Sequence, residues 1–427
     1  MLLNIKKYNK YNNKIETMTL SAGNVTRMVA SYSYDDIGRL VSLKRSGNAG
    51  IVNYAYNIRN WLKEAKSDRF CQNLLYENTG AYPCFNGNIS RMQWQTSKDN
   101  VLRGYDFAYD GLNRLEESTY SEGAGMSQNK NRYSENILSY SPNGSIERLQ
   151  RYGKKNNGTF GLIDDLSYSY NGNQVKAISD KAGSLLYDGS FDFKDGANAD
   201  VEYFYDANGA LVKDLNKGIS NIEYDILGNL KCITFSNGFK TKYIYDAAGN
   251  KLRITHESVV TNTTDYIGNF VLEDGKLSKY LFDGGYCSFD NNQNPTFHYY
   301  EKDHLGSVRM VVNENGTIEQ VNHYYQLEGY METCHIIANT KRASTSARSS
   351  TTCMGWIGMT MGLECMMRQD WLGIGWSLCM TNITLLILIC IVEIIRLILL
   401  MMMVIELLCG IKTKSEMINL SFLQDKK

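Results

Sequence analysis

Hydrophobic and polar residues alternate in short runs along most of the chain, and a recurring turn-forming phrase separates the runs. The phrase reads Tyr-x-Tyr-Asp/Asn-x-x-Gly-x-Leu and is clearest at residues 32–40. Side chains of a strand point alternately to its two faces, so Tyr-x-Tyr places two aromatic rings on one face. The Asp or Asn can hydrogen-bond nearby backbone and start a turn, and Gly supplies the positive φ of a turn closed by a bulge. Because Leu then restarts the alternation, one copy of the phrase predicts one β-hairpin.

Copies of the phrase recur between residues 31 and 325 with varying completeness. The steps between Tyr205, Tyr224 and Tyr245 are 19 and 21 residues, and longer steps elsewhere indicate insertions in loops. The defining positions of the five clearest copies are Tyr34, Asp35 and Gly38; Tyr109 and Asp110, with Asn113 in place of the glycine; Tyr205, Asp206 and Gly209; Tyr224, Asp225 and Gly228; and Tyr245, Asp246 and Gly249. A lone hairpin is barely stable in water, so consecutive copies are expected to pair edge to edge. The predicted fold is therefore all-β, built from tandem hairpins.

Composition supports this interpretation and narrows the chemistry. The chain has 30 Tyr and 36 Gly but only 3 Pro, as expected for strands that need their backbone donors. Lys plus Arg equals Asp plus Glu at 45 each, so no net field favours nucleic acid as a partner. The cysteines before residue 330 are scattered and form no C-x-x-C pair, so neither a metal site nor a cofactor is expected. The first residues carry charges without an apolar core after them, which is not the pattern of a signal peptide.

The composition changes abruptly near residue 326. The last tyrosine is Tyr330, whereas six of the ten Cys and eleven of the seventeen Met lie beyond it. The segment 383–408 is mostly Ile, Leu and Met and is long enough to cross a bilayer. It also contains Glu393, Arg396 and Glu406, and each ionised group costs on the order of 2.5–3.5 kcal/mol at mid-membrane. A membrane is therefore a partner only if 383–408 is a true span; otherwise the tail 326–427 is expected to be irregular or helical.

A change of reading frame explains the tail better. Codons permitted for residues 356–367, read from the third base of each, allow Asp-Trp-Tyr-Asp-Tyr-Gly-Ala-Arg-Met-Tyr-Asp, and the missing tyrosines reappear. We therefore hypothesise one frameshift just after Tyr325. Resequencing the gene across residues 324–328 tests this, and an uninterrupted frame in several isolates would overturn it.

Residues 298–325 hold the most specific motif of the chain, Asp303-His304-Leu305-Gly306-Ser307-Val308-Arg309. With the Tyr-Asp phrases, it resembles the YD repeats of the RHS family and the start of the RHS repeat-associated core. The resemblance covers about residues 31–325. It divides the chain into a lead-in (1–30), a YD-repeat region (31–297), the start of the core (298–325) and a divergent tail (326–427).

The resemblance implies a spiral β-shell that encloses or presents a C-terminal effector or toxin, in an exported or cell-surface protein of bacteria. Similar shells occur in insecticidal toxin complexes and in animal teneurins. The implied partners are the remainder of the shell, the effector, and its cognate immunity or export machinery. Several members cleave their own core with aspartates that would lie beyond Tyr325, so no catalytic residue is assigned in this chain.

Asp303, His304 and Ser307 are the residue types of a hydrolase triad, but they lie too close on one strand and turn to converge. We expect Asp303 and Gly306 to shape a turn and His304 to bond locally. The sequence thus predicts a non-enzymatic structural fragment of an RHS-type protein. Two alternatives stay open: a carbohydrate-binding or adhesive surface module that uses rows of tyrosines, and a membrane-anchored protein that uses 383–408.

Overall fold

The structure is a computed structural model that describes residues 2–10, 13–22, 25–77, 82–186, 191–290, 292, 294–327 and 329–335. These residues belong to the first of two compact units, Met1–Gly355; the second unit, Trp356–Lys427, lies outside the described residues. Every regular element among the described residues is a β-strand, which confirms the all-β prediction. The described part of the chain contains no helix long and apolar enough to cross a membrane, and the segment 383–408 lies outside it.

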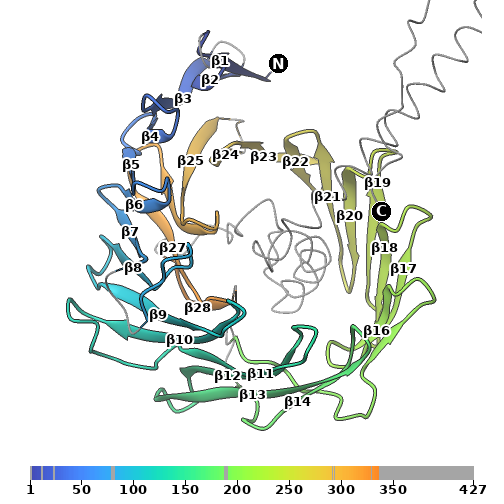
Figure 1. The fold of residues 1–427 in the computed structure, drawn as a ribbon. Coiled ribbons are helices and arrows are strands. Elements are labelled where there is room, and N and C mark those ends of the chain that lie inside the picture. The colour runs from blue at the N-terminus through green and yellow to red at the C-terminus, as the bar shows by residue number, and fades with distance from the viewer. Residues whose placement is uncertain are drawn as a thin grey trace, which may run out of the picture. The chain divides into compact units, whose positions relative to one another are not determined.

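The first sheet has 14 antiparallel strands whose spatial order follows the chain. Figure 1 shows them in blue to green. They are β1 (Leu2–Tyr8), β2 (Ile15–Ala22), β3 (Val25–Tyr34), β4 (Leu40–Arg45), β5 (Ile51–Tyr56), β6 (Leu62–Lys66), β7 (Phe70–Leu75), β8 (Arg91–Thr96), β9 (Arg103–Tyr109), β10 (Leu115–Glu122), β11 (Glu135–Tyr140), β12 (Ile146–Lys154), β13 (Phe160–Asn171) and β14 (Gln174–Asp180).

The second sheet repeats this plan with another 14 antiparallel strands in chain order. They are β15 (Tyr203–Tyr205), β16 (Leu211–Asp214), β17 (Ile219–Tyr224), β18 (Leu230–Phe235), β19 (Lys240–Tyr245), β20 (Lys251–Glu257), β21 (Thr261–Ile267), β22 (Phe270–Glu273), β23 (Lys276–Phe282), β24 (Gly285–Phe289), β25 (Pro295–Lys302), β26 (Val308–Asn313), β27 (Ile318–Tyr324) and β28 (Tyr330–His335).

The sheets extend beyond the predicted repeat region at both ends. Strands β1 and β2 lie within the predicted lead-in and pair with each other and with β3. Strand β28 pairs with β27, so the second sheet continues a few residues past the change of composition near 326. The remainder of the predicted tail, 336–427, lies outside the described residues.

The Tyr-Asp phrase forms the turn between two paired strands, as its copy at residues 32–40 shows. Tyr34 pairs with Leu40, and a one-residue register shift precedes this pair. The backbone N–H of Asp35 donates to the carbonyl of Arg39, and its carboxylate accepts the N–H of Arg39 at 2.7 Å. The same carboxylate-to-backbone bonds recur at Asp110, Asp206, Asp225, Asp246 and Asp303. At Asp225, hydrogen bonds from the Asn229 side chain and from turn N–H groups lower the carboxyl pKa.

A left-handed backbone is required at the glycine of the phrase. Gly38 and Gly228 have φ of 84° and 79°, and Asn113 takes the same role at 63° in the copy without glycine. Asn adopts this conformation more readily than other side-chain-bearing residues, which explains the tolerated replacement.

Gly228→Ala is therefore expected to cost about 1–2 kcal/mol of the free energy of unfolding. A Cβ at Gly228 would meet nothing within 4 Å, so the cost is conformational only. Gly111→Ala is a matched control because Gly111 has the same open surroundings without the positive φ. Chemical denaturation of both variants tests this, and equal stabilities would contradict it.

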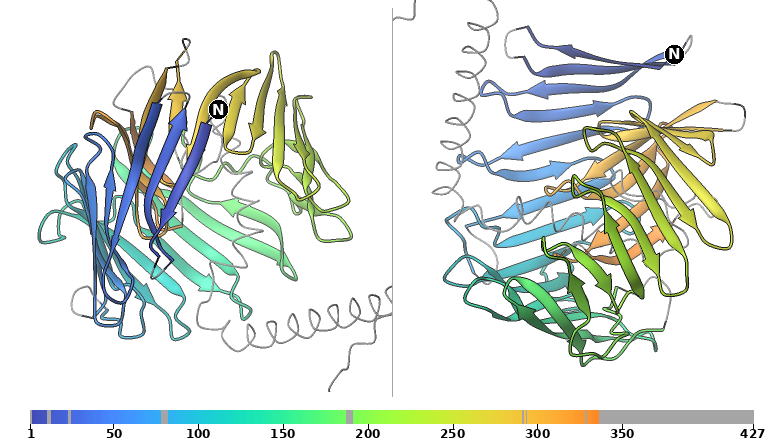
Figure 2. Two further views of the ribbon diagram at one scale, coloured as in Figure 1. Left: turned by 90° about the horizontal axis from the view of Figure 1, so that it is seen from above. Right: turned by 90° about the vertical axis from the view of Figure 1, so that its right-hand side faces the viewer.

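The end of the second sheet packs face to face on the first sheet. One buried cluster joins residues of β7–β10, such as Trp94 and Tyr105, to Met310, Val321 and Tyr325. A second cluster joins residues of β2–β4 to residues of β23–β25, including Phe297 and Tyr299. Figure 1 shows β25, β27 and β28 on the concave side of β3–β10, and Figure 2 shows the first-sheet strands stacked in chain order. We call this contact between the sheets the seam.

Candidate functional site

In most copies, the second tyrosine of the phrase connects its hairpin to the one before it. The Tyr34 hydroxyl donates to the carbonyl of Ile15 at 3.0 Å, and the Tyr56 hydroxyl donates to the carbonyl of Leu40 at 2.9 Å. The same bond is made by Tyr76 to Leu62, Tyr109 to Ile89, Tyr140 to Leu115, Tyr170 to Ile146, Tyr205 to Val175, Tyr224 to Leu211 and Tyr324 to Val308. These hydroxyl groups are engaged in hydrogen bonds between neighbouring hairpins, which favours a structural role for the tyrosines over ligand binding.

Tyr109→Phe removes one such bond without changing the ring. We expect a loss of about 1 kcal/mol in the free energy of unfolding, because the carbonyl of Ile89 loses its donor. The exposed Tyr82 provides the control, since Tyr82→Phe removes a hydroxyl from the surface. Equal denaturation midpoints for the two variants would contradict the connecting role.

The Asp303–Arg309 motif forms a hairpin turn whose charged ends are buried. The Asp303 carboxylate accepts the N–H groups of Leu305 and Ser307 and receives Arg309 Nε at 2.7 Å. The two charged side chains are 2% and 3% exposed. Gly306 has φ of 88°, as the predicted turn requires. This segment therefore builds a turn, and its Asp, His and Ser do not form a triad.

His304 does not bond locally as predicted; it reaches across the seam. Its backbone N–H donates to Gln72 Oε1 at 3.0 Å, and its Nδ1 lies 3.2 Å from Gln72 Nε2. Arg309 also contacts both sheets, because its guanidinium lies 5.1 Å from the ring of Trp94 and 5.0 Å from that of Tyr324. The partner of His304 could not be predicted, because Gln72 lies 232 residues away and the contact leaves no local sequence pattern.

Further polar bonds cross the seam. The buried Arg45 donates to the carbonyls of Gly284 and Tyr300 at 2.9 and 2.6 Å. Ser67 donates to Glu301 at 2.7 Å, and Trp94 Nε1 donates to His323 Nδ1 at 3.1 Å. Burial lowers the pKa of His323 to about 3, which leaves its ring neutral and able to accept. The seam is therefore specified by hydrogen bonds as well as by apolar packing.

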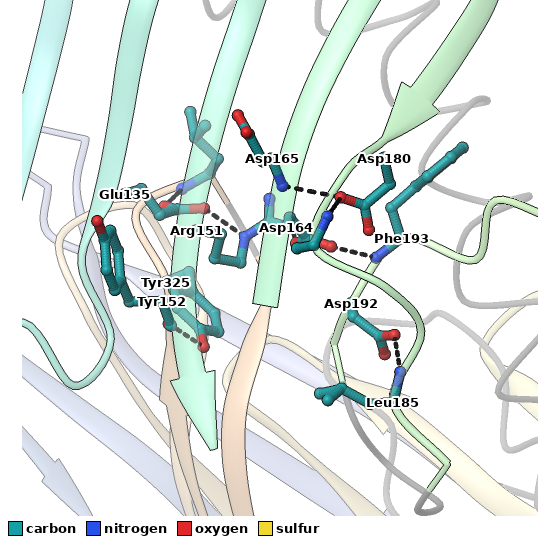
Figure 3. Close-up of polar contacts among 12 residues, drawn as sticks. Glu135, Arg151, Tyr152, Asp164, Asp165, Asp180, Leu185, Asp192, Phe193 and Tyr325 are labelled. Atoms are coloured by element: carbon teal, nitrogen blue, oxygen red, sulfur yellow. Dashed lines mark hydrogen bonds and ion pairs between the residues drawn. The ribbon is translucent and has the colours of Figure 1, made fainter. Parts of the chain in front are cut away.

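A buried charged group lies where the chain leaves β27. Arg151 on β12 donates to Glu135 at 2.9 Å and to Asp164 at 2.5 Å (Figure 3). Glu135 and Asp164 are 1% and 0% exposed. Asp164 also accepts the backbone N–H of Phe193 at 2.7 Å. We call Glu135, Arg151 and Asp164 the charged clamp.

The charged clamp holds the residues that follow β27. The free oxygen of Glu135 accepts the backbone N–H of Leu327 at 2.9 Å, and the Tyr325 hydroxyl donates to the carbonyl of Tyr152 at 2.8 Å (Figure 3). Arg151 lies 5.5 Å from the ring of Tyr325. The direction of the chain after Tyr325 is thus fixed by the first sheet.

The positions predicted from the sequence are spread along the sheets and do not converge on one centre. Of the Asp303–Arg309 motif, His304 and Arg309 meet residues of the first sheet at the seam, and Asp303 bonds Arg309. The charged clamp could not be predicted from the sequence, because its three members come from separate strands. The described residues hold no cluster of His, Cys, Asp or Glu suited to a metal ion.

These features define a class of protein: a wall of antiparallel hairpins in which the end of the second sheet is folded back on the first sheet. No family model and no curated relative matches the sequence. The fold is similar to the crystal structure of TcdB2-TccC3, with a TM-score of 0.60, 14% identity, and coverage of 78% of this chain and 18% of that chain.

Two related crystal structures match in the same way. TcdB2-TccC3 without its hypervariable C-terminal region gives a TM-score of 0.57, 14% identity, and coverage of 78% and 17%. TcdB2-TccC3-Cdc42 gives a TM-score of 0.52, 16% identity, and coverage of 78% and 17%. This chain therefore spans less than a fifth of the length of these structures, and the likeness is one of fold.

Proposed function

We propose that this chain is a structural part of the wall of an RHS-type β-shell, which encloses or presents a C-terminal effector. One observation carries the proposal: the charged clamp and Tyr152 hold the chain at Tyr325 and Leu327. A wall that fixes the point where its own chain leaves the last repeat also determines where a downstream segment begins.

The similar structures support this proposal. They contain this fold within much longer chains, and one of them is described as lacking a hypervariable C-terminal region. We accordingly propose that the partners of the present chain are the remainder of a shell and a variable effector that follows it. We also propose an exported or cell-surface location for the intact protein.

Protease protection tests the function directly. The gene would be expressed in the hypothesised alternative reading frame after Tyr325, so that the downstream polypeptide is present. We expect the downstream polypeptide to survive a protease dose that digests the same polypeptide made alone. Digestion at equal rates would contradict enclosure. Specific binding of the wall to a glycan array, without such protection, would favour the carbohydrate-binding alternative.

A further inference from the structure

Three strands of the second sheet bring together a serine, a histidine and a glutamate outside the seam. Ser288 Oγ on β24 lies 2.8 Å from His298 Nε2 on β25. His298 Nδ1 lies 2.6 Å from Glu319 Oε2 on β27. A carboxylate can only accept, so the proton of the neutral ring is on Nδ1, and Nε2 is the acceptor for the Ser288 hydroxyl.

The three side chains are held in place by their neighbours. The ring of Tyr286 stacks on His298 at 4.4 Å with an interplanar angle of 10°. The second oxygen of Glu319 accepts Asn313 Nδ2 at 3.2 Å. His298 and Glu319 have side chains 7% and 9% exposed, whereas Ser288 is only partly buried. The base and its carboxylate are thus enclosed, and the hydroxyl is within reach of solvent.

Strand alternation turns Ser288 away from the first sheet. Cys287 and Phe297 belong to the cluster at the seam, so their neighbours Ser288 and His298 point to the opposite face. Lys279 is the register partner of Ser288 on β23 and therefore shares that face. Its Nζ lies 5.7 Å from the ring of Tyr286 and 4.0 Å from Glu273 Oε1.

From this geometry we propose that Ser288 is an activated nucleophile that takes an acyl group from small esters. His298 accepts the hydroxyl proton as Ser288 Oγ forms a bond to the carbonyl carbon, and Glu319 orients and stabilises the imidazolium. Lys279 supplies positive charge for the developing oxyanion. The alkoxide leaves with the proton from His298, and water then releases the acid by the reverse sequence.

The proposed reaction of Ser288 is independent of the wall function, which the protease-protection experiment tests. The experiment treats the folded full chain with a fluorophosphonate probe and locates the adduct by peptide mass spectrometry. In that reaction the Oγ–P bond forms, the P–F bond breaks, fluoride leaves, and His298 takes the proton. We expect one adduct, on Ser288. No adduct on Ser288 in the folded chain would overturn the proposal.

Variants separate activation from folding. Ser288→Ala should abolish labelling, whereas Ser220→Ala, which removes an exposed serine of β17, should leave it unchanged. Glu319→Gln should slow labelling about 100-fold, and Glu319→Asp should restore part of the rate. Equal labelling rates for wild type and Glu319→Gln, with both folded by circular dichroism, would mean that the serine is not activated by this pair.

Discussion

Replacing Arg151 with Met is expected to lower the free energy of unfolding by about 3–5 kcal/mol, because two buried carboxylates lose their shared cation. Arg151 contacts Glu135 and Asp164, and all three side chains are 10% exposed or less. Met fills a similar volume without supplying charge or donors. Urea denaturation followed by circular dichroism measures the loss.

Arg148→Met is the matched control for this prediction. Arg148 lies on the same strand and pairs with Asp165 at 3.3 Å, but its side chain is 46% exposed. Exposed pairs contribute roughly 0–1 kcal/mol, so this variant should stay close to wild type. Similar losses for the two variants would contradict the burial of the charged clamp.

The stability of the Arg151→Met variant is also expected to depend on pH. Burial raises the pKa of Asp164 to about 6 in the native protein, although Arg151 opposes the rise. Without Arg151 the folded pKa should rise further. A carboxyl whose folded pKa is raised contributes stability below its unfolded pKa and loses it as pH rises through the folded value. The deficit of Arg151→Met should therefore shrink between pH 8 and pH 5, and a constant deficit would contradict this cause.

Arg309→Met is expected to cost about 3–5 kcal/mol as well, for a related reason at the seam. Asp303 would keep its two backbone donors but lose the guanidinium, and Trp94 would lose the cation over its ring. Thermal and urea unfolding of the full chain measure the effect. The turn itself should survive, because its bonds to Leu305 and Ser307 are local.

Arg253→Met provides the control for Arg309→Met. Arg253 pairs with Asp265 in the same sheet at 2.5 Å, but its side chain is 49% exposed. Its loss should cost less than about 1 kcal/mol. A loss for Arg253→Met that matches that of Arg309→Met would show that the seam does not bury the motif.

The hairpins could be predicted from the sequence because their contacts are short in range. Asp225, for example, bonds the backbone two and four residues further on, and the left-handed residue is a glycine in most copies. Strand order followed from the same repetition. Local chemistry and repetition together determine the sheet before any distant contact forms.

The seam could not be predicted, because its partners are distant and follow no repeat. Trp94 and His323 are 229 residues apart, and Arg45 bonds carbonyls that any residue could supply. The charged clamp was missed for a related reason: charged residues within alternating strands suggest a solvated face. Burial of that face depends on Tyr325 and Leu327, which arrive from the other sheet.

The end of the second sheet is folded onto the first sheet, and a double-mutant cycle between Trp94 and His323 tests this contact most directly. Trp94→Phe removes the donor and His323→Leu removes the acceptor of a buried bond between the sheets. With the His323 pKa near 3, the ring stays neutral from pH 5 to 8, so the result should not depend on pH in that range. We expect a coupling free energy of about 1 kcal/mol. Additive losses, with no coupling, would contradict the seam and the wall built on it.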